Sequence, residues 1–452
     1  MRVMVIGGGG REHALVWKLS SSPMIGSRQN LYCVPGNAGI EPLATCLAEP
    51  PAGLRDVRAL ANLAQEHRID FTVVGPELPL TMGLADELAS RGLACFGATR
   101  AAARLEGSKV FAKQFMERHG IPTAPFAVFD SSGPAIDYLG RSERAYPTVV
   151  KADGLAAGKG VVVAATRQEA EAAVRAMIDE RQFGEAGARI VIEECLVGHE
   201  ASFFAMTDGD RVVPLATCQD YKRALDGDRG PNTGGMGAVS PSTQMDATLE
   251  GVIMSRVVVP TVRAMALESA PYRGVLYVGL MLTPSGPMVL EYNARFGDPE
   301  TQVLMPRYAA DILPMMLWAA GRMEGGQDQD AAWRPGSAAC VVLASRGYPG
   351  ASDSGRPIDG LQAAAAGAGT TVFHAATRKG VDSSGREVVL TAGGRVLAVS
   401  AVGRDLEEAV ERAYAGAGRI KFEGMQFRRD IGGRTVATPG SENQRRGNGE
   451  VA

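Results

Sequence analysis

The first hundred residues alternate short apolar, β-branched runs with helical segments, and this alternation limits the fold more than any other feature. The predicted strands are residues 3–6, 31–34, 71–74 and 94–96, and the predicted helices are residues 12–20, 57–67 and 81–90. Strands that alternate with helices predict a parallel, doubly wound α/β sheet. Turn-forming residues follow three of the strands, at 7–10, 35–39 and 75–77. Because ligands bind at the carboxyl ends of parallel strands, we expect these three loops to face one site.

A glycine-rich segment at 151–161 lies between two further β-branched runs and contains Lys151 and Lys159. Small residues let a backbone approach phosphate oxygens closely, and the lysines supply positive charge. The segment is not a P-loop, because Asp153 replaces a required glycine and Gly160 replaces a required serine or threonine. It also leads into a strand rather than a helix. It is therefore an ordinary glycine turn or, as we favour, a flexible flap that closes over a nucleotide.

The glycine run at 7–10 raises a second possibility, the dinucleotide site of an NAD-dependent oxidoreductase. That fingerprint requires a small residue at its third position, where this chain has Glu12 or His13, depending on which glycine is counted first. The second predicted strand also lacks the acidic residue that would bind ribose hydroxyls. Backbone N–H groups at the start of a helix still bind phosphate well, and Arg11 adds positive charge. A phosphorylated small molecule is the better interpretation, and NAD remains the alternative.

The strand-like segment 288–295 carries a third candidate feature. Residues two apart in a strand share a face, so Glu291, Asn293 and Arg295 should project together. Carboxylate and amide oxygens suit Mg²⁺, and an arginine beside them would bind a carboxylate or a developing phosphoryl charge. The alternative is a solvated edge strand with a surface ion pair. The segment 296–300, Phe-Gly-Asp-Pro-Glu, follows directly and favours the functional interpretation.

Two other segments complete the candidate site. The apolar run at 190–196 leads into an acidic linker, whose free backbone groups would pair with an adenine edge and whose Glu200 would bind ribose. A long glycine loop at 230–238 follows a charged stretch at 219–223, and such loops inside compact domains are usually functional. The five histidines show no metal-ligand spacing, so we interpret each as structural.

Composition places the chain among ordinary globular proteins. Its 452 residues are 45% hydrophobic and 21% charged, with a formal net charge of −3. This length allows about three domains, and the weak charge counts against a nucleic-acid partner. The six cysteines are scattered, which is typical of reduced thiols in a cytoplasmic protein. We expect no signal peptide and no membrane-spanning segment, because a strand begins at residue 2 and no apolar run is long enough.

Taken in their order along the chain, five segments resemble the ATP-grasp ligases, and in particular the family that joins glycine to 5-phosphoribosylamine. These segments are residues 9–15, 35–39, 151–161, 230–238 and 295–302. The resemblance covers residues 1–431 and implies an N-terminal doubly wound α/β domain that binds substrate, a central ATP-grasp domain with a small mobile lid subdomain, and a C-terminal α/β domain. Their expected bounds are 1–105, 106–325 with the lid at about 122–189, and 326–432, before a disordered tail at 433–452.

The resemblance also implies a role for each matching residue. The ATP phosphates would be contacted or covered by Lys109, Lys151, Asp153, Gly154, Gly158, Lys159 and Gly160. The adenine hinge would consist of Glu193, Glu194 and Leu196, the ribose would bind Glu200, and the magnesium or manganese ligands would be Glu291 and Asn293. The residues near glycine and the acyl phosphate would be Arg295, Asp298 and Asp220. The phosphoribosylamine site would be lined by Gly9, Gly10, Arg11, Glu12, Asn37 and Glu77.

The implied reaction forms an amide through glycyl phosphate and yields glycinamide ribonucleotide, ADP and phosphate, a step of purine biosynthesis. Phosphoryl transfer of this kind relies on positioning and charge neutralisation, and the sequence offers no protein nucleophile with an adjacent base. Another ATP-grasp ligase or carboxylase would share the nucleotide apparatus, but the N-terminal loops and the loop at 230–238 favour the glycine ligase. We expect a monomeric cytoplasmic enzyme that acts on small molecules and binds neither nucleic acid nor a membrane.

Overall fold

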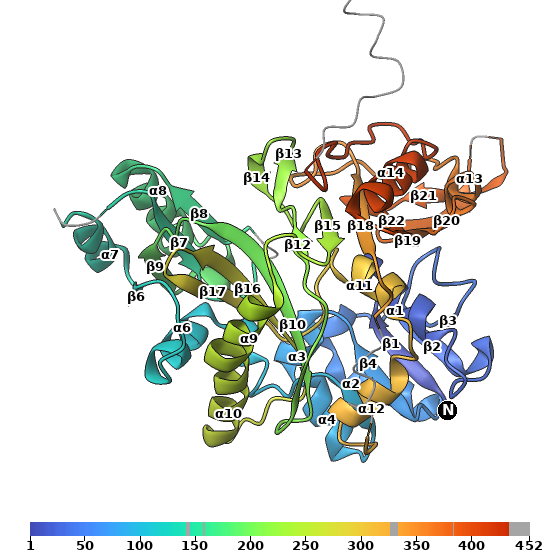
Figure 1. Cartoon of the computed structure of the whole chain (residues 1–452), viewed down its shortest axis with the longest axis horizontal. Coiled ribbons are helices and arrows are strands. Elements are labelled where there is room, and N and C mark those ends of the chain that lie inside the picture. Colours follow the sequence, from blue (N-terminus) through green and yellow to red (C-terminus); the bar gives the residue numbers. More distant parts are fainter. Residues whose placement is uncertain (142–144, 157–158, 326–332, 383, 434–452) are drawn as a thin grey trace, which may run out of the picture.

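The computed structural model describes residues 1–141, 145–156, 159–325, 333–382 and 384–433. The described chain is an α/β protein with an N-terminal parallel sheet, two antiparallel sheets in its central part, and a C-terminal sheet. In Figure 1 the N-terminal part is blue and lies at the lower right, with the orange and red C-terminal part above it. The tail expected at 433–452 lies outside the described residues beyond Gly433.

The N-terminal sheet has five parallel strands in the order β3-β2-β1-β4-β5. The strands are β1 Val3–Gly7, β2 Leu31–Pro35, β3 Thr45–Cys46, β4 Phe71–Val74 and β5 Ala94–Phe96. The helices of this part are α1 Gly10–Leu19, α2 Val57–Glu66, α3 Glu77–Met82 and α4 Leu84–Ser90. Alternate residues of β1 belong to two different hydrophobic clusters, so both faces of the sheet are buried. The predicted parallel sheet is confirmed, and β3 is an additional short strand at its edge.

The single helix predicted at 81–90 is wrong, because two helices occupy this region. α3 starts at Glu77 and ends at Met82, and its C-cap Gly83 has a left-handed φ of +91°. Glycine adopts this conformation without the steric penalty of a Cβ atom and commonly ends helices. α4 then begins at Leu84. The earlier start of α3 places Glu77 in its first turn, close to the carboxyl end of β4.

The region 122–189, which we call the lid, forms most of a small antiparallel sheet and two helices. The sheet has the order β6-β9-β7-β8, with β6 Phe126–Phe129, β7 Thr148–Ala152, β8 Val161–Ala164 and β9 Ile190–Glu194. Helices α7 Ser132–Leu139 and α8 Arg167–Ile178 share a hydrophobic cluster with β7, β8 and β9. β7 and β8 pair on either side of the glycine-rich segment, as the sequence predicts. This unit lies at the upper left of Figure 1.

The central sheet has the order β11-β10-β16-β17. Its strands are β10 His199–Thr207, β11 Val212–Pro214, β16 Gly274–Thr283 and β17 Gly286–Asn293. A long helical segment packs against it through apolar side chains and consists of α9 Ala247–Ile253, the π-helical η4 Met254–Val258 and α10 Val259–Leu267. Two helices, α5 Arg104–Gly107 and α6 Lys109–Arg118, connect this part to the N-terminal sheet.

A β-bulge interrupts the pairing of β16 with β17 next to the predicted metal residues. Gly279 pairs with Glu291, but the next residue of β16 pairs with Val289, so Leu290 is an extra residue. Bulges of this kind bend a strand and change the direction of the side chains that follow. β17 ends at Asn293, so the prediction that Arg295 continues the same strand is wrong.

The C-terminal sheet combines strands from two distant parts of the chain. Its order is β12-β15-β18-β22-β19, with β12 Gln219–Asp220, β15 Gly237–Ser240, β18 Ser337–Ala344, β19 Thr370–His374 and β22 Arg395–Gly403. Two hairpins accompany it, β13 Arg223–Leu225 with β14 Arg229–Asn232, and β20 Thr377–Val381 with β21 Glu387–Thr391. The remaining helices are α11 Thr301–Arg307, α12 Leu313–Ala319, α13 Leu361–Ala365 and α14 Leu406–Ala417. Because β15 pairs with β18, the glycine loop at 230–238 is fixed to the C-terminal sheet.

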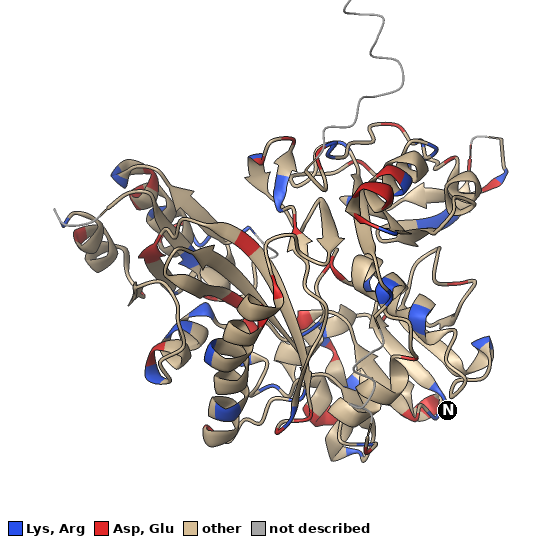
Figure 2. Cartoon of the chain, in the orientation of Figure 1, with Lys and Arg blue, Asp and Glu red and all other residues tan. Residues whose placement is uncertain are grey.

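Charged residues are distributed over the whole described chain. Figure 2 shows basic and acidic residues interspersed in the N-terminal, central and C-terminal parts. All six cysteines are free thiols. Among the described helices, none is both long and apolar enough to cross a membrane.

Candidate active site

One large cavity lies where the three parts of the chain meet. Its volume is about 860 Å³, which suits a nucleotide together with a small substrate. The predicted site residues that line it are Arg11, Glu77, Lys109, Lys151, Lys159, Gly160, Glu193, Glu194, Leu196, Glu200, Asp220, Glu291, Asn293, Arg295 and Asp298. The other described site residues do not line it, and these are Gly9, Gly10, Glu12, Asn37, Asp153 and Gly154. Gly158 lies outside the described residues.

Asp153 anchors the glycine-rich segment to α6 and does not face the cavity. Its Oδ1 accepts hydrogen bonds from Ser108 Oγ at 2.7 Å and from Val110 N at 2.9 Å. Its Oδ2 forms an ion pair with Arg189 at 2.6 Å. Ser108 is also the N-cap of α6, so one carboxylate joins the end of β7 to the start of this helix. Both carboxylate oxygens of Asp153 are thus engaged in structural contacts, and its expected contact with ATP phosphates stays a prediction.

Two cavity lysines form a buried cluster around Glu193. The carboxylate of Glu193 is 2% exposed and lies 2.5 Å from both Lys151 Nζ and Lys113 Nζ. Burial raises the pKa of Glu193, but the two ammonium groups outweigh burial and the net pKa is lowered. Burial also lowers the pKa of Lys113 to about 8. The Glu193 side chain is therefore occupied in this cluster, and its backbone lies in the pairing of β9 with β6 and β7.

Lys109 is the first residue of α6 and reaches the cavity from the opposite side of the glycine-rich segment. Its Nζ donates a hydrogen bond to the Gly154 carbonyl oxygen at 3.2 Å. Burial lowers the pKa of Lys109, while the nearby Glu291 carboxylate opposes this effect. Lys109 and Lys151 therefore bring two cationic groups to the part of the cavity that Glu291 also lines.

Glu291 and Asn293 reach the cavity from the end of β17. The Glu291 side chain is 37% exposed, and its Oε1 lies 3.6 Å from Lys222 Nζ. Burial raises the pKa of Glu291, but Lys222 and other cations outweigh burial and hold the pKa below its ordinary value. Asn293 Oδ1 accepts a hydrogen bond from Arg295 at 3.1 Å. An ionised carboxylate and an amide oxygen fit a hard divalent cation.

The described residues contain no group of three or more His, Cys, Asp or Glu side chains that could hold a metal ion by themselves. A cation at Glu291 and Asn293 would therefore take its other ligands from phosphate oxygens and water. Mg²⁺ is commonly bound in this way, through one or two carboxylates plus substrate phosphates. The donor set thus fits a cation that arrives together with a nucleotide.

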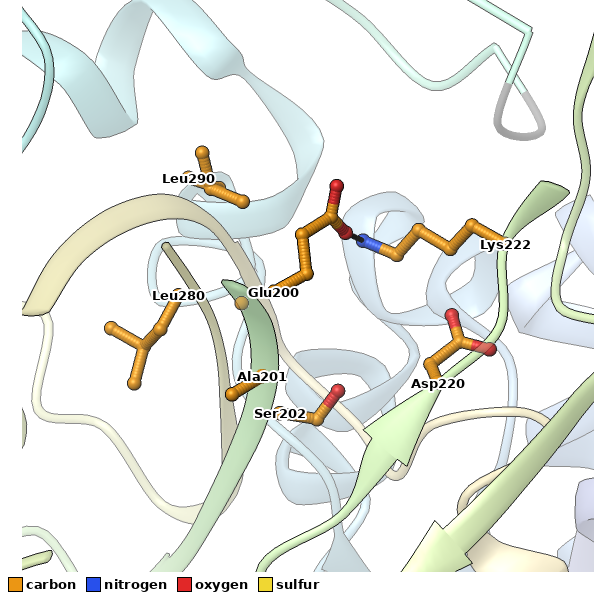
Figure 3. A pocket seen from close by; sticks show the side chains of 8 residues that line it. Glu200, Ala201, Ser202, Asp220, Lys222, Leu280 and Leu290 are labelled. Carbon is orange, nitrogen blue, oxygen red and sulfur yellow. Dashed lines mark ion pairs between the residues drawn. The ribbon is translucent and has the colours of Figure 1, made fainter. Parts of the chain in front are cut away.

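A small recess opens beside the main cavity between β10, β12 and β17, and Figure 3 shows its lining. Lys222 Nζ lies 3.2 Å from Glu200 Oε2, and Figure 3 shows Asp220 beside this pair. Asp220 Oδ1 is buried and has no hydrogen-bond partner among the residues that the structure describes. Burial and the neighbouring Glu300 raise the pKa of Asp220 well above its ordinary value. A buried, unpaired carboxyl oxygen at a cavity wall is suited to bind a donor group of a ligand.

Arg295 is held between two acidic side chains from the N-terminal part of the chain and α5. It forms ion pairs with Glu106 at 2.8 Å and with Glu77 at 3.4 Å. Burial raises the pKa of Glu106 to about 7, against the opposing effect of Arg295. Burial has the same tendency at Glu77, but there Arg295 and Arg11 prevail and lower the pKa. The guanidinium group is therefore fixed in position before any ligand binds.

Glu12 caps its own helix, and this explains why it does not line the cavity. Its Oε2 accepts a hydrogen bond from Gly9 N at 2.7 Å, and its Oε1 accepts one from Arg11 Nε at 2.6 Å. The first of these contacts satisfies the backbone N–H of Gly9, the N-cap of α1, and is the half of a capping box that a glycine N-cap allows. A Cβ atom on Gly75 would collide with the Glu12 carboxylate, so the loops after β1 and β4 touch. Glu12 thus supports Arg11, which faces the cavity.

Asn37 joins the loop after β2 to two other parts of the molecule. Its Nδ2 donates to the Gly8 carbonyl at 2.9 Å and to the His374 carbonyl at 2.8 Å, while its Oδ1 accepts from Gly39 N at 2.9 Å. His374 N in turn donates to His13 Nδ1 at 2.7 Å. The three N-terminal loops therefore converge as the sequence predicts, and β19 of the C-terminal sheet completes their contacts.

Asp298 lies at the junction of the N-terminal loops, the central part and the C-terminal sheet. Its Oδ2 is 2.9 Å from Arg395, and its Oδ1 accepts a hydrogen bond from Gln302 Nε2 at 2.6 Å. Burial raises the pKa of Asp298, but Arg395 and Arg11 outweigh burial, and the net pKa is lowered. Asp298 is therefore an ionised carboxylate on the cavity wall.

Sequence reasoning missed several residues that line the cavity, among them Glu106, Lys113, Lys222, Glu300, Tyr348 and Arg395. Lys113 follows Lys109 by one helical turn, and this spacing on one helix face was an available signal. Lys222 belongs to the charged stretch at 219–223, which precedes the glycine loop that the sequence marks as functional. Tyr348 and Arg395 carry no local signal, because they reach the cavity only through the pairing of β15, β18 and β22.

Comparison with known families identifies all three parts of the chain. Models of phosphoribosylglycinamide synthetase match its N domain to residues 1–106, its ATP-grasp (A) domain to residues 107–301 and its C domain to residues 338–434. The chain is 48% identical to a phosphoribosylamine–glycine ligase of Vibrio cholerae over 439 residues, which are 97% of this chain and 99% of the relative. It is 49% identical to the ligase of that name from Caulobacter vibrioides over 436 residues, 96% and 99% of the two chains.

Solved structures agree with these matches. A crystal structure of phosphoribosylamine–glycine ligase from Thermotoga maritima is 33% identical, with a TM-score of 0.79 over 95% of this chain and 100% of that one. A biotin carboxylase from Campylobacter jejuni shares the fold, with a TM-score of 0.69 at 14% identity over 94% and 92% of the two chains. Family matches cover nearly the whole length, and the cavity brings residues from all three matched domains together. The chain therefore belongs to the phosphoribosylglycinamide synthetase family.

Proposed function

We propose that this chain ligates glycine to 5-phosphoribosylamine at the expense of ATP, giving glycinamide ribonucleotide, ADP and phosphate, a step of purine biosynthesis. The ATP-grasp domain uses ATP together with a divalent metal ion, and the ion we propose is Mg²⁺ or Mn²⁺. The single observation that carries the proposal is the shared cavity. Its lid side presents lysines and metal-binding oxygens, and its N-terminal side presents Arg11, Glu77 and Asp298.

The nucleotide would lie between the lid and the central sheet. Lys109 and Lys151 would bind its phosphates, and the glycine-rich segment, through Lys159 and Gly160, would cover them. The backbone at the end of β9 would pair with the adenine edge, and Glu200 would accept hydrogen bonds from ribose hydroxyls. These roles follow from the position of each residue on the cavity wall.

A bound divalent cation supplies charge neutralisation and a template for the transferred phosphoryl group. Glu291 and Asn293 would hold it, because they combine an ionised carboxylate and an amide oxygen at one strand end. Lys222, which contacts Glu291 at 3.6 Å, would turn toward Glu200 when the cation is present.

In the first half-reaction a glycine carboxylate oxygen attacks the γ-phosphorus of ATP, and the bond from that phosphorus to the ADP oxygen breaks. Arg295 would bind the carboxylate and the transferring phosphoryl group, and the acidic pair that fixes Arg295 reduces the reorganisation needed. The unpaired Oδ1 of Asp220 would accept a hydrogen bond from the glycine ammonium group.

In the second half-reaction the amine of phosphoribosylamine attacks the carbonyl carbon of glycyl phosphate. A carbon–nitrogen bond forms, the bond from carbon to the phosphate oxygen breaks, and the nitrogen loses a proton. Arg11 and the start of α1 would hold the sugar phosphate near Asp298, because Arg11 lines the cavity with Asp298 and the Gly9 backbone faces the Asp298 carboxylate. No protein nucleophile is required, since both steps depend on positioning and charge.

The N-terminal loops favour this reaction over that of a sibling ATP-grasp enzyme. The biotin carboxylase structures share the fold at about 15% identity and carry no argument about substrate. We also propose a monomer in the cytoplasm, and the six free cysteines support a reducing compartment.

The proposal is tested by ADP release from ATP and Mg²⁺, with phosphoribosylamine generated in place. We expect ADP to form only when glycine is present, in equimolar amount with glycinamide ribonucleotide. Replacing glycine by bicarbonate or formate distinguishes a carboxylase or formate-dependent sibling. ADP release that needs no glycine, or that needs bicarbonate instead, would contradict the proposal.

A further inference from the structure

The C-terminal sheet contributes an arginine whose position the phosphoryl-transfer chemistry does not explain. Arg395 begins β22, is 20% exposed, and lines the cavity about 100 residues away in sequence from the metal-binding strand. A β-bulge in the pairing of β18 with β22 lies directly beside it. Bulges next to active sites commonly redirect a side chain.

We propose that Arg395 is a positioning residue for the second half-reaction, which holds Asp298 and the Gly234–Gly235 backbone so that Asp298 receives the attacking amine. The inference rests on the proposed function. It adds a residue of the C-terminal sheet and gives Asp298 and Arg395 different roles. Asp298 touches the amine in this scheme, whereas Arg395 acts only through Asp298 and the glycine loop.

The guanidinium group of Arg395 makes contacts on two sides. One terminal nitrogen donates to the carbonyl oxygens of Gly234 at 2.5 Å and of Asp298 at 2.7 Å. The other lies 2.9 Å from Asp298 Oδ2. A single planar fork therefore fixes both the backbone and the carboxylate of Asp298, and it also fixes the loop that faces them. Lysine cannot reproduce this geometry, because it is a point charge without a fork.

The same loop has a second support from the C-terminal part. Gly234 N donates to the hydroxyl of Tyr348 at 3.0 Å. The next residue, Gly235, has a φ of +109°, and a Cβ atom there would lie 2.9 Å from Asp220 Oδ1. Arg395 and Tyr348 thus hold a loop that lies against Asp220 and Pro299, and Arg395 links the same loop to Asp298.

The surroundings of Asp298 fit a role in the second half-reaction. A Cβ atom built on Gly9 would lie 3.6 Å from Asp298 Oδ2, so this oxygen faces the loop that starts α1. Arg395 and Arg11 keep the carboxylate ionised. An ionised carboxylate at this place accepts a hydrogen bond from the amine, orients its lone pair and takes the proton that the nitrogen loses. The first half-reaction needs none of these contacts.

The test separates the two half-reactions in Arg395→Met, Arg395→Lys and the exposed control Arg386→Met. Hydroxylamine serves as a small nucleophile that intercepts glycyl phosphate, so glycine hydroxamate formation from ATP, glycine and Mg²⁺ reports the first half-reaction. The complete reaction gives kcat/KM for phosphoribosylamine. Thermal unfolding of each variant checks that it folds, and Asp298→Asn, which leaves Arg395 in place, is the second variant.

We expect Arg395→Met to lower kcat/KM for phosphoribosylamine about 100-fold while hydroxamate formation changes by less than about threefold. Asp298→Asn should show the same split, Arg395→Lys a partial recovery, and Arg386→Met neither loss. Equal losses in both assays, or no loss in either, would overturn the assignment of Arg395. Failure of the native enzyme to form glycine hydroxamate would instead overturn the proposed function.

Discussion

The lid side and the junction side of the cavity are built differently. On the lid side, Lys109, Lys151 and Glu291 come from β-strand and helix ends, and Glu291 is 37% exposed. On the junction side, Asp298 is enclosed by Arg395, Gln302 and the loop at Gly9. On the lid side we expect the charged groups to exchange partners when a ligand binds. The junction side holds charges whose partners are already fixed by three parts of the chain.

This difference matches the chemistry of the two proposed steps. Phosphoryl transfer requires cationic groups that neutralise the charge of the phosphates. We expect Lys151 to leave Glu193, and Lys109 to leave the Gly154 carbonyl, when phosphate oxygens bind. Attack by an amine on an acyl phosphate requires a fixed approach and exclusion of water. The comparison therefore predicts that lid-side changes act on both steps, whereas junction-side changes act mainly on the second.

The largest effect is expected for Glu291→Gln, which removes the carboxylate that we propose as a metal ligand. We expect the overall rate to fall about 1,000-fold, because charge neutralisation in the transition state is lost. Hydroxamate formation should fall equally. Steady-state rates over a Mg²⁺ series provide the measurement, with the exposed Glu423→Gln as control. A rate equal to that of the native enzyme at ordinary Mg²⁺ would show that Glu291 is not a ligand.

Lys151→Met should have the next largest effect. We expect kcat/KM for ATP to fall about 100-fold, because one phosphate-binding cation is lost. Glu193 keeps Lys113 as its partner, so the buried carboxylate is not left alone and the variant should fold. ATP kinetics measure the effect, and Lys379→Met, an exposed lysine of the C-terminal part, is the control. Unchanged ATP kinetics would remove Lys151 from the nucleotide site.

Gly235→Ala tests the junction side through the backbone. The residue has a φ of +109°, and its Cβ would collide with Pro299 as well as approach Asp220. We expect stability to fall by about 1–3 kcal/mol and the second half-reaction to slow more than the first. Gly251→Ala, in the middle of α9 where nothing lies within 4 Å of the new Cβ, should not destabilise the protein. Equal effects of the two substitutions in chemical unfolding would contradict this prediction.

The smallest effect concerns pH and the contact between α1 and β19. Burial lowers the pKa of His13 to about 3 and that of His374 to about 4, so both stay neutral in the folded protein well below the ordinary value of 6.5. The unfolded chain binds protons first as pH falls below that value, so stability is lost with falling pH. When the pH falls from about 7.5 to 5, each histidine should lower the free energy of unfolding by about 2 kcal/mol.

His13→Asn keeps an acceptor for the His374 amide and removes one titrating group. Chemical unfolding as a function of pH should then show about half of the native pH dependence in this range. An unchanged pH dependence would mean that other groups dominate acid destabilisation of the junction.

The sequence predicted the fold where local signals are strong and failed where the contact partner is distant. Alternating strands and helices gave the parallel sheet and the convergence of three loops, because strand ends and turn residues mark these positions locally. The break at Gly83 was missed, since nothing in a helical pattern shows that one glycine adopts a left-handed conformation. The bulge at Leu290 was missed for the same reason, and it decides where Glu291 projects.

Individual site residues show a similar division. The residues on lid strands and on β17 reach the cavity as expected. Asp153 and Asn37 instead make contacts with residues far along the chain, and Glu12 caps its own helix. The sequence around Arg395 does not predict that this residue reaches the cavity, because only the pairing of β15, β18 and β22 brings it to Asp298. The roles assigned to the individual residues stay predictions until the variants are measured.

The most direct test of the two-step scheme follows one oxygen atom. Glycine labelled with ¹⁸O in both carboxylate positions is supplied with ATP, Mg²⁺ and phosphoribosylamine, and the released phosphate is analysed by mass spectrometry. Because the carboxylate oxygen that attacks ATP leaves with the phosphate, we expect one ¹⁸O atom in each phosphate and one in each amide product. Unlabelled phosphate would show that glycine is not activated as an acyl phosphate and would contradict the account.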